Sequence, residues 1–233
     1  KCWEMLSILP KRNIKSVILK KEIKDKLISD IDFFLTNRDW YEERGLNYKT
    51  SIVLEGPPGT GKTSAIKALA SYFDKEIYII NLNMMSDSSF PKALSSVKMG
   101  SFVVIEDFDS VDTTHSREKQ KEKTSTNEDN TLSLTTILNS LDGIVSLDGI
   151  VVFLTTNHIS KIDSAIIRKG RIDNIFTIGY LGNVEIKEQT KVYFPDEDVN
   201  LVMVSNIPGC DVQSCFLESR GDYKKYLELL NKK

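Results

Sequence analysis

Short apolar runs alternate with segments of helical periodicity over the first 180 positions of the chain. The apolar runs predict buried strands, because strands covered on both faces of a parallel sheet show continuous hydrophobicity. These runs lie at 51–54, 77–80, 102–105, 150–154 and 175–178. Apolar residues at helical spacing predict helices at 21–35, 64–70, 90–97 and 132–141, and a short extended segment is expected at 16–19. Strands separated by helices predict an α/β fold whose parallel sheet is covered on both faces.

The pattern changes near position 182, after which only helical spacing is found. Helices are predicted at 184–193, 212–217 and 223–230. Pro195 and Pro208-Gly209 separate them, because both residue types interrupt helices. The sequence therefore predicts two domains, a large α/β domain over residues 1–180 and a small helical domain over residues 181–233.

A glycine-rich segment between the first predicted strand and a predicted helix fits the template G-x-x-x-x-G-K-[ST]. Glycines let successive backbone N–H groups turn toward phosphate oxygens, and the following helix directs the positive end of its dipole at the same anion. The lysine can reach the terminal phosphates and the next hydroxyl can bind Mg²⁺. A glycine turn without a ligand is the alternative, which the flanking strand and helix disfavour. The predicted nucleotide-binding residues are Gly56, Pro57, Pro58, Gly59, Thr60, Gly61, Lys62, Thr63 and Ser64.

Two carboxylates follow the strand predicted at 102–105, at the edge where ligands collect in an open parallel sheet. Hydrolysis of a nucleoside triphosphate needs one acidic group near the metal and one that orients or polarises the attacking water. Glu106 and Asp107 can supply both, and Asp109 can support the same site. A solvated strand end is the alternative for the pair alone. Their position after a phosphate loop favours a Walker B motif.

An amide and two guanidinium groups follow the next predicted strand. Asn157 could hold the attacking water or the terminal phosphate, because it presents one donor and one acceptor in a fixed geometry. Arg168 and Arg171 lie in a turn between a helix and a strand. The alternative for Asn157 is an ordinary asparagine of a turn, and the alternative for the arginines is a solvated surface position. The functional interpretation of the arginines is a finger that reaches the nucleotide of a neighbouring subunit, because guanidinium forks match phosphate oxygens.

Composition limits the partners of the chain. It has 233 residues, 40% of them hydrophobic, which is enough for one substantial core and a small second domain. Because 31 basic residues face 33 acidic ones, the net charge is −2, and the bulk electrostatic basis for nucleic-acid binding is missing. Three cysteines without paired C-x-x-C spacing and two distant histidines favour a reducing compartment and no structural zinc.

Neither a membrane span nor a secretory signal is predicted. No stretch reaches the roughly 18 apolar residues of a membrane span, so we expect no direct membrane contact and a chain that is soluble as it stands. The chain opens on Lys1, as expected of a processed chain or an excised fragment, and a membrane-anchored parent protein stays open. The compartment is therefore undetermined. Residues 112–130 contain no apolar side chain, which predicts a solvated loop with an exposed, inert His115.

Taken in order, four segments resemble the AAA+ ATPases: GPPGTGKT, FVVIEDFD, FLTTNH and AIIRKGRID. Three further features resemble one branch of that superfamily, the mitochondrial-chaperone BCS family. They are WYEERGL at 40–46, the carboxylate order Glu106-Asp107 in place of Asp-Glu, and LNSLDG at 138–143. The resemblance covers residues 16–230.

The resemblance implies a P-loop NTPase fold. It implies a three-layer sandwich with a five-stranded parallel sheet, and a small helical lid over the nucleotide. ATP and Mg²⁺ are the implied cofactors. By position, Lys62 and Thr63 bind phosphate and Mg²⁺, Glu106 lies at the metal, and Asp107 is the catalytic carboxylate. Because Asp107 is shorter than the glutamate of most relatives, the division of roles between the two carboxylates stays open.

The resemblance also implies assembly, because subunits of this kind form rings. Asn157 takes the place of the polar sensor, and Arg168 and Arg171 take the places of fingers that act across the subunit boundary. One departure concerns residues 81–99, which lack the aromatic-apolar-glycine pore loop, although Met84-Met85 offers an apolar pair. Threading of unfolded protein is therefore disfavoured.

These observations predict ATP hydrolysis at subunit interfaces of a homo-oligomeric ring, coupled to remodelling or translocation of a protein client. Two alternatives stay open. A nucleic-acid motor or clamp-loader-like factor would need a basic pore or groove, and stimulation of the ATPase by DNA or RNA would favour it. A nucleotide-dependent assembly switch or scaffold would assemble with a non-hydrolysable analogue and show no turnover stimulated by a substrate.

Overall fold

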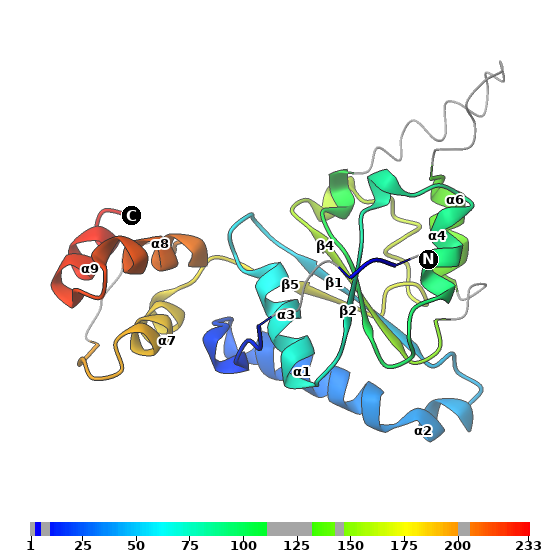
Figure 1. Cartoon of the computed structure of the whole chain (residues 1–233), viewed down its shortest axis with the longest axis horizontal. Coiled ribbons are helices and arrows are strands. Elements are labelled where there is room, and N and C mark those ends of the chain that lie inside the picture. The colour runs from blue at the N-terminus through cyan, green and yellow to red at the C-terminus, as the bar shows by residue number, and fades with distance from the viewer. Residues whose placement is uncertain (1–2, 6–9, 111–131, 143–146, 200–205) are drawn as a thin grey trace, which may run out of the picture.

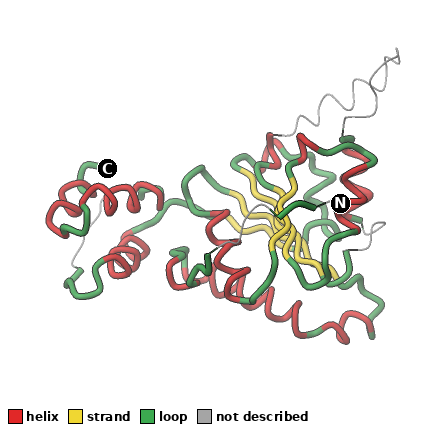
Figure 2. The backbone as a smooth tube through the Cα atoms, in the orientation of Figure 1, coloured by secondary structure: helices red, strands yellow, loops and turns green. Residues whose placement is uncertain are grey.

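A five-stranded parallel sheet forms the centre of the protein in this computed structural model (Figures 1 and 2). The structure describes residues 3–5, 10–110, 132–142, 147–199 and 206–233. The strand order is β2-β3-β4-β1-β5, and every neighbouring pair is parallel. The predicted α/β class and parallel sheet are thus confirmed. The strands are β1 (Lys49–Glu55), β2 (Ile77–Ile80), β3 (Phe102–Ile105), β4 (Ile150–Thr156) and β5 (Asn174–Thr177).

Successive residues of the central strands face opposite sides of the sheet, and each side has its own apolar core. In β4, Val152 and Leu154 belong to one core while Val151 and Phe153 belong to the other, and all four are fully buried. This burial on both faces explains why the strand is an uninterrupted apolar run in the sequence. Each such side chain contributes about 1.5–3 kcal/mol by leaving water.

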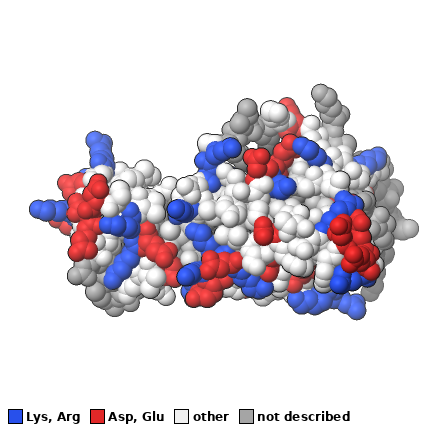
Figure 3. Space-filling model, turned by 90° about the horizontal axis from the view of Figure 1, so that it is seen from below, with Lys and Arg blue, Asp and Glu red and all other residues white. Residues whose placement is uncertain are grey.

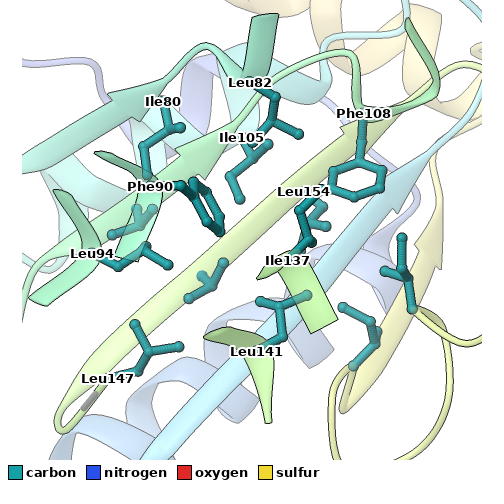
Figure 4. Close-up of a cluster of buried hydrophobic side chains, with 14 of the residues drawn as sticks. Ile80, Leu82, Phe90, Leu94, Ile105, Phe108, Ile137, Leu141, Leu147 and Leu154 are labelled. Atoms are coloured by element: carbon teal, nitrogen blue, oxygen red, sulfur yellow. The ribbon is translucent and has the colours of Figure 1, made fainter. Parts of the chain in front are cut away.

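One face of the sheet is covered by two short helices, α4 (Ser89–Ser95) and α6 (Leu134–Leu141). Their buried residues Phe90 and Ile137 enter the same core as Leu154 of β4 (Figure 4). Ser133 caps α6 by accepting a hydrogen bond from the backbone N–H of Thr136, which fixes where this helix begins.

The opposite face is covered by α1 (Lys21–Thr36) and α3 (Lys62–Tyr72). In α1 the buried residues are Leu27, Ile31 and Phe34, whose spacing of four and three places them on one side of the helix. These helices complete the three-layer arrangement of helix, sheet and helix that is visible in Figure 1.

Three helices form the C-terminal part, α7 (Asn183–Tyr193), α8 (Gly209–Ser219) and α9 (Tyr223–Leu230). They lie at one end of the molecule in Figure 1 and enclose a separate apolar cluster. At its centre Tyr226 is fully buried and its hydroxyl shares a 2.8 Å hydrogen bond with Thr190. Burial raises the pKa of Tyr226 to about 12. The predicted helical part is present, whereas the division into two domains at residue 180 stays a prediction.

Three local features differ from the expectation or fall outside the description. A 3-10 turn at Ile14–Ser16 precedes the buried residues Val17 and Leu19, so the expected extended segment is shorter than 16–19. The helix α2 (Arg38–Glu42) was not predicted, because five residues are too few to show a helical period. The predicted solvated loop at 112–130, with His115, lies outside the described residues. Among the described helices, none combines the length and the hydrophobicity needed to cross a membrane.

Candidate nucleotide-binding site

The predicted phosphate loop, residues 56–61, joins β1 to α3 at the carboxyl edge of the sheet. Gly56 has a φ angle of 144°, and a Cβ there would overlap the carbonyl oxygen of Ile178. Gly59 has a φ angle of 76°, and a Cβ there would overlap the Sγ of Cys210. Glycine is therefore required at both positions. The loop backbone can approach an anion that lies at the start of α3.

The ammonium group of Lys62 is buried against this loop. Its Nζ donates to the carbonyl oxygens of Gly56 at 2.7 Å and Pro57 at 3.0 Å, and to Oδ1 of Asn157 at 2.8 Å. An ammonium has three donors, so all three are used. A phosphate placed here could replace these oxygens as the acceptor, and the lysine would then be already aimed at it.

The charge on Lys62 depends on its surroundings. Burial lowers the pKa of Lys62 below its usual value, and the negative charges of Asp107 and Asp109 offset part of that shift. A bound phosphate would favour the charged form further, because a nearby opposite charge raises the pKa of a lysine. The site is thus suited to an anionic ligand.

Thr63 and Glu106 form the second element of the site. The Thr63 hydroxyl donates a 2.7 Å hydrogen bond to Oε1 of Glu106, although the two residues lie 43 positions apart. A hydroxyl and a carboxylate oxygen this close fit Mg²⁺, which prefers oxygen ligands and commonly takes only one or two carboxylates, with phosphates and water completing its shell. These two residues would hold the ion.

Asp107 directly follows Glu106 at the end of β3 and adopts an unusual backbone conformation. Its φ angle is +47°, a left-handed value that aspartate tolerates better than most residues. The backbone N–H of Asp107 donates to Oγ1 of Thr155 at 3.1 Å, which fixes this turn onto β4. The side chain is exposed and makes no hydrogen bond with any described residue, so its carboxylate is open to a ligand or to water.

Asn157 is held at the end of β4 by Asp109. One oxygen of Asp109, Oδ1, accepts hydrogen bonds from Oγ1 of Thr156 at 2.8 Å and from the backbone N–H of Asn157 at 3.0 Å. Burial alone would raise the pKa of Asp109, but these hydrogen bonds outweigh it, and the pKa lies below its usual value. Asp109 is therefore suited to remain an ionised acceptor.

The sheet order explains why these residues meet. β3, β4 and β1 are neighbours, and the carboxyl ends of parallel strands lie at the same edge. The structure thus brings together five of the residues predicted for the site, and their individual roles stay predictions. The five are Lys62, Thr63, Glu106, Asp107 and Asn157.

The two predicted finger arginines lie elsewhere, near the amino edge of the sheet. Gly170, between them, accepts a 3.3 Å hydrogen bond from Nζ of Lys49, the first residue of β1. Arg168 is exposed. The guanidinium of Arg171 instead forms a two-bonded fork with Asp142, with Nε and Nη2 each 2.6 Å from a carboxylate oxygen. The structure does not bring either arginine to the phosphate loop of the same chain.

Some contacts to the loop had no signal in the sequence. Nη1 of Arg12 donates to Oγ of Ser64 at 3.1 Å, and the backbone N–H of Arg12 donates to Oγ of Ser71, about two turns further along the same face of α3. The backbone N–H of Cys210, at the start of α8, donates to the carbonyl oxygen of Gly59 at 3.1 Å. Arg12 lies in a segment without hydrophobic periodicity, and Cys210 and Gly59 are about 150 positions apart, so neither contact could be predicted from the sequence pattern.

Comparison with known proteins decides the family. Residues 52–180, more than half of the chain, match the model of the ATPase family associated with various cellular activities (AAA). The chain belongs to this AAA family. It is an ATPase and therefore binds a nucleotide, as the phosphate loop indicates.

Individual relatives of this AAA chain are mitochondrial chaperones by name. It is 33% identical over 211 residues to the probable mitochondrial chaperone BCS1-B of Dictyostelium discoideum, which covers 80% of the chain and 46% of that protein. It is 32% identical over 194 residues to human mitochondrial chaperone BCS1, covering 82% of the chain and 46% of that protein. The predicted resemblance to the BCS family is confirmed. The chain spans less than half the length of these relatives.

Proposed function

We propose that this AAA chain hydrolyses ATP at the subunit interfaces of a homo-oligomeric ring and couples hydrolysis to remodelling or translocation of a protein client. The position of the arginines is the observation that supports the interface. β1 separates Lys49, next to the arginine turn, from the phosphate loop, and its six residue steps span about 20 Å. An exposed Arg168 can therefore serve the nucleotide of another subunit rather than its own. Rings are general among AAA+ proteins.

In the proposed reaction, the loop and Lys62 hold the phosphates and the other residues prepare the water. Backbone N–H groups of residues 56–61 and the Lys62 ammonium bind the β- and γ-phosphate oxygens. Thr63 and Glu106 would hold Mg²⁺, which would supply positive charge to the phosphate oxygens. Asp107 accepts a hydrogen bond from the attacking water and orients its oxygen toward the γ-phosphorus.

The remaining groups stabilise the transferred phosphoryl group. The water oxygen forms a bond to phosphorus, the bond to the bridging oxygen breaks, and ADP and phosphate result. Asn157 lies beside Lys62 and can bind a γ-phosphate oxygen or the water. Arg168 of a neighbouring subunit supplies positive charge on the open side, as in other phosphoryl-transfer enzymes that use an arginine finger.

A protein client is favoured by the relatives and by the charge distribution. The relatives are named as chaperones, which is consistent with a protein substrate. On the face that Figure 3 shows, basic and acidic side chains are interspersed and do not form a single basic area of the kind that nucleic acid requires. Met84, which is 80% exposed after β2, offers an apolar contact for a client.

The ring mechanism is tested by dilution. Turnover per subunit and particle mass are measured over a wide range of protein concentration, with saturating ATP and Mg²⁺. Turnover should rise steeply as the chain assembles, and a monomer should bind nucleotide without hydrolysing it. Constant turnover per subunit down to a demonstrated monomer would contradict hydrolysis at an interface.

A further inference from the structure

Asp109 occupies a position from which it can set the geometry of Asn157. Its Oδ1 atom accepts two hydrogen bonds, from the hydroxyl of Thr156 and from the backbone N–H of Asn157. Two donors, one on the last residue of β4 and one on the residue that follows it, thus converge on a single oxygen. These two hydrogen bonds fix the position and the orientation of the peptide group between Thr156 and Asn157.

The side chain of Asn157 links this fixed peptide to Lys62. The Asn157 side chain leaves this fixed peptide, and its Oδ1 accepts a 2.8 Å hydrogen bond from Lys62 Nζ. A continuous series of hydrogen bonds therefore runs from Asp109 to Asn157 to Lys62. Asp109 makes no hydrogen bond with Lys62, so apart from the attraction of its charge it acts on the position of the lysine through Asn157.

The turn that carries Asp109 does not depend on these bonds for its own position. Phe108, the residue before it, is buried in the core beside Leu154 (Figure 4). The backbone N–H of Asp107 is separately bound to Thr155. With two independent anchors on this turn, Asp109 is held in place to accept the hydrogen bonds of Thr156 and Asn157.

We infer that Asp109 is a positioning residue that holds the Asn157 amide in reach of the Lys62 ammonium and of the terminal phosphate. The inference rests on the proposed role of Asn157 in hydrolysis. Loss of Asp109 would remove the acceptor of the Asn157 backbone N–H and let this residue shift. Misplacement of a catalytic group by about 1 Å can reduce a rate by about a hundredfold.

The test compares two substitutions that differ in one property. Asp109→Asn keeps an oxygen that can accept both hydrogen bonds and removes the charge, whereas Asp109→Ala removes the acceptor. Asp109→Ala should lower kcat by at least about tenfold, while the Kd for a fluorescent ATP analogue stays within about twofold. Asp109→Asn should retain most of the wild-type kcat. Equal losses in the two variants would overturn the inference, because charge and not the acceptor would then matter.

A double-mutant cycle separates positioning from a structural role. In an Asn157→Ala background, Asp109→Ala should lower kcat by less than about twofold, because its target is already absent. Losses that multiply independently would also overturn the inference. If Asp109→Ala does not fold, Asp109→Ser, whose hydroxyl is too short to reach both donors, replaces it in the same cycle with the same expected losses.

Two controls keep the inference distinct from the proposed function. Glu55→Ala removes another carboxylate at the same edge, which accepts a 2.5 Å hydrogen bond from Thr177, and it should leave kcat unchanged. If Asn157→Ala itself hydrolyses ATP normally, the proposed role of Asn157 fails. If Asn157→Ala is slow while Asp109→Ala is as fast as wild type, only the positioning role fails.

Discussion

Arg171 and Asp142 form a two-bonded fork at the amino edge of the sheet, with both nitrogen–oxygen distances at 2.6 Å. The third nitrogen of the same guanidinium, Nη1, donates to the carbonyl oxygen of Ala165 at 2.5 Å. Of the two arginines predicted as fingers, Arg171 is therefore held within its own chain. Arg168 is the one whose side chain is exposed, and the fork fixes the turn from which it projects.

The fork should contribute modestly to stability in a way that depends on pH. The hydrogen bond from Arg171 is the main reason that the pKa of Asp142 lies below its usual range. Because the Asp142 side chain is 40% exposed, solvent screening limits the contribution to about 1 kcal/mol. Asp142→Asn should lower the melting temperature at pH 7 by about 2–4 °C, measured by calorimetry.

The sign of the pH effect follows from the lowered pKa. The stabilisation is present above the unfolded-state pKa of about 3.9 and is lost as pH falls through the lower folded-state value. The difference between wild type and Asp142→Asn should therefore shrink as pH falls below the unfolded-state pKa, and it should disappear once Asp142 is protonated in the folded protein. Asp148→Asn, in an exposed single-bonded pair with Arg38, is the matched control and should show a smaller difference at pH 7. A difference that persists at low pH would show that the fork is not its source.

Lys62→Ala should abolish nucleotide binding in a folded protein. The substitution removes the buried cation that lies among Gly56, Pro57 and Asn157, and no other described lysine donates to these residues. Binding of a fluorescent ATP analogue should fall by far more than in Lys67→Ala, a change of another lysine on the same helix. Circular dichroism establishes that both variants are folded. Near-normal affinity in Lys62→Ala would remove the proposed role of the loop lysine.

The two carboxylates after β3 should give different defects. Asp107→Asn should bind ATP with Mg²⁺ but scarcely hydrolyse it, because the amide keeps the shape and loses the charge that orients water. Glu106→Gln should instead lower the affinity for Mg²⁺, since Glu106 is the carboxylate bonded to Thr63. Titration of Mg²⁺ at saturating ATP, beside single-turnover rates, distinguishes them. If the two phenotypes are exchanged, Glu106 orients the water and Asp107 holds Mg²⁺, and the assignment made above is wrong.

The sequence was sufficient to predict the residues that meet at the carboxyl edge. Lys62, Glu106 and Asn157 each follow a buried apolar run, and strands of one parallel sheet present their carboxyl ends together. The register that joins Lys62 to Asn157 depends on β1 and β4 being neighbours, which the order of elements along the chain does not specify. Spacing could therefore predict a common edge but not which side chains touch.

Other contacts were beyond the reach of sequence patterns for a different physical reason. The Arg171 fork depends on Asp142, 29 positions earlier, and a single carboxylate after a helix has no periodic signal. The contact of Arg12 with Ser64 comes from a segment outside any regular element. Hydrophobic periodicity indicates which residues are buried, so it cannot predict polar contacts between surface segments.

The last prediction concerns which subunit supplies Arg168 to the nucleotide. Arg168→Ala keeps the phosphate loop and both carboxylates, and Asp107→Asn keeps its arginines, so a mixed assembly contains some interfaces with every group intact. At equal amounts and random mixing, about one interface in four pairs an intact Asp107 with an intact Arg168. ATPase activity of the mixture should return toward about a quarter of the wild-type value per subunit, although each variant alone is inactive.

The matched mixture for this experiment uses Arg168→Ala with a variant that carries Arg168→Ala, Arg171→Ala and Asp107→Asn together. It should stay inactive, because neither partner then supplies Arg168. Lys169→Ala removes the neighbouring exposed cation, whose Nζ donates to the Asp173 carbonyl, and should hydrolyse ATP at the wild-type rate. Subunit exchange is first established by fluorescence, because a mixture that does not exchange cannot form composite sites. Arg171 is bound to Asp142 and Ala165 of its own chain and so is not expected to replace Arg168. Full activity of Arg168→Ala alone would therefore show that hydrolysis does not need an arginine from this turn.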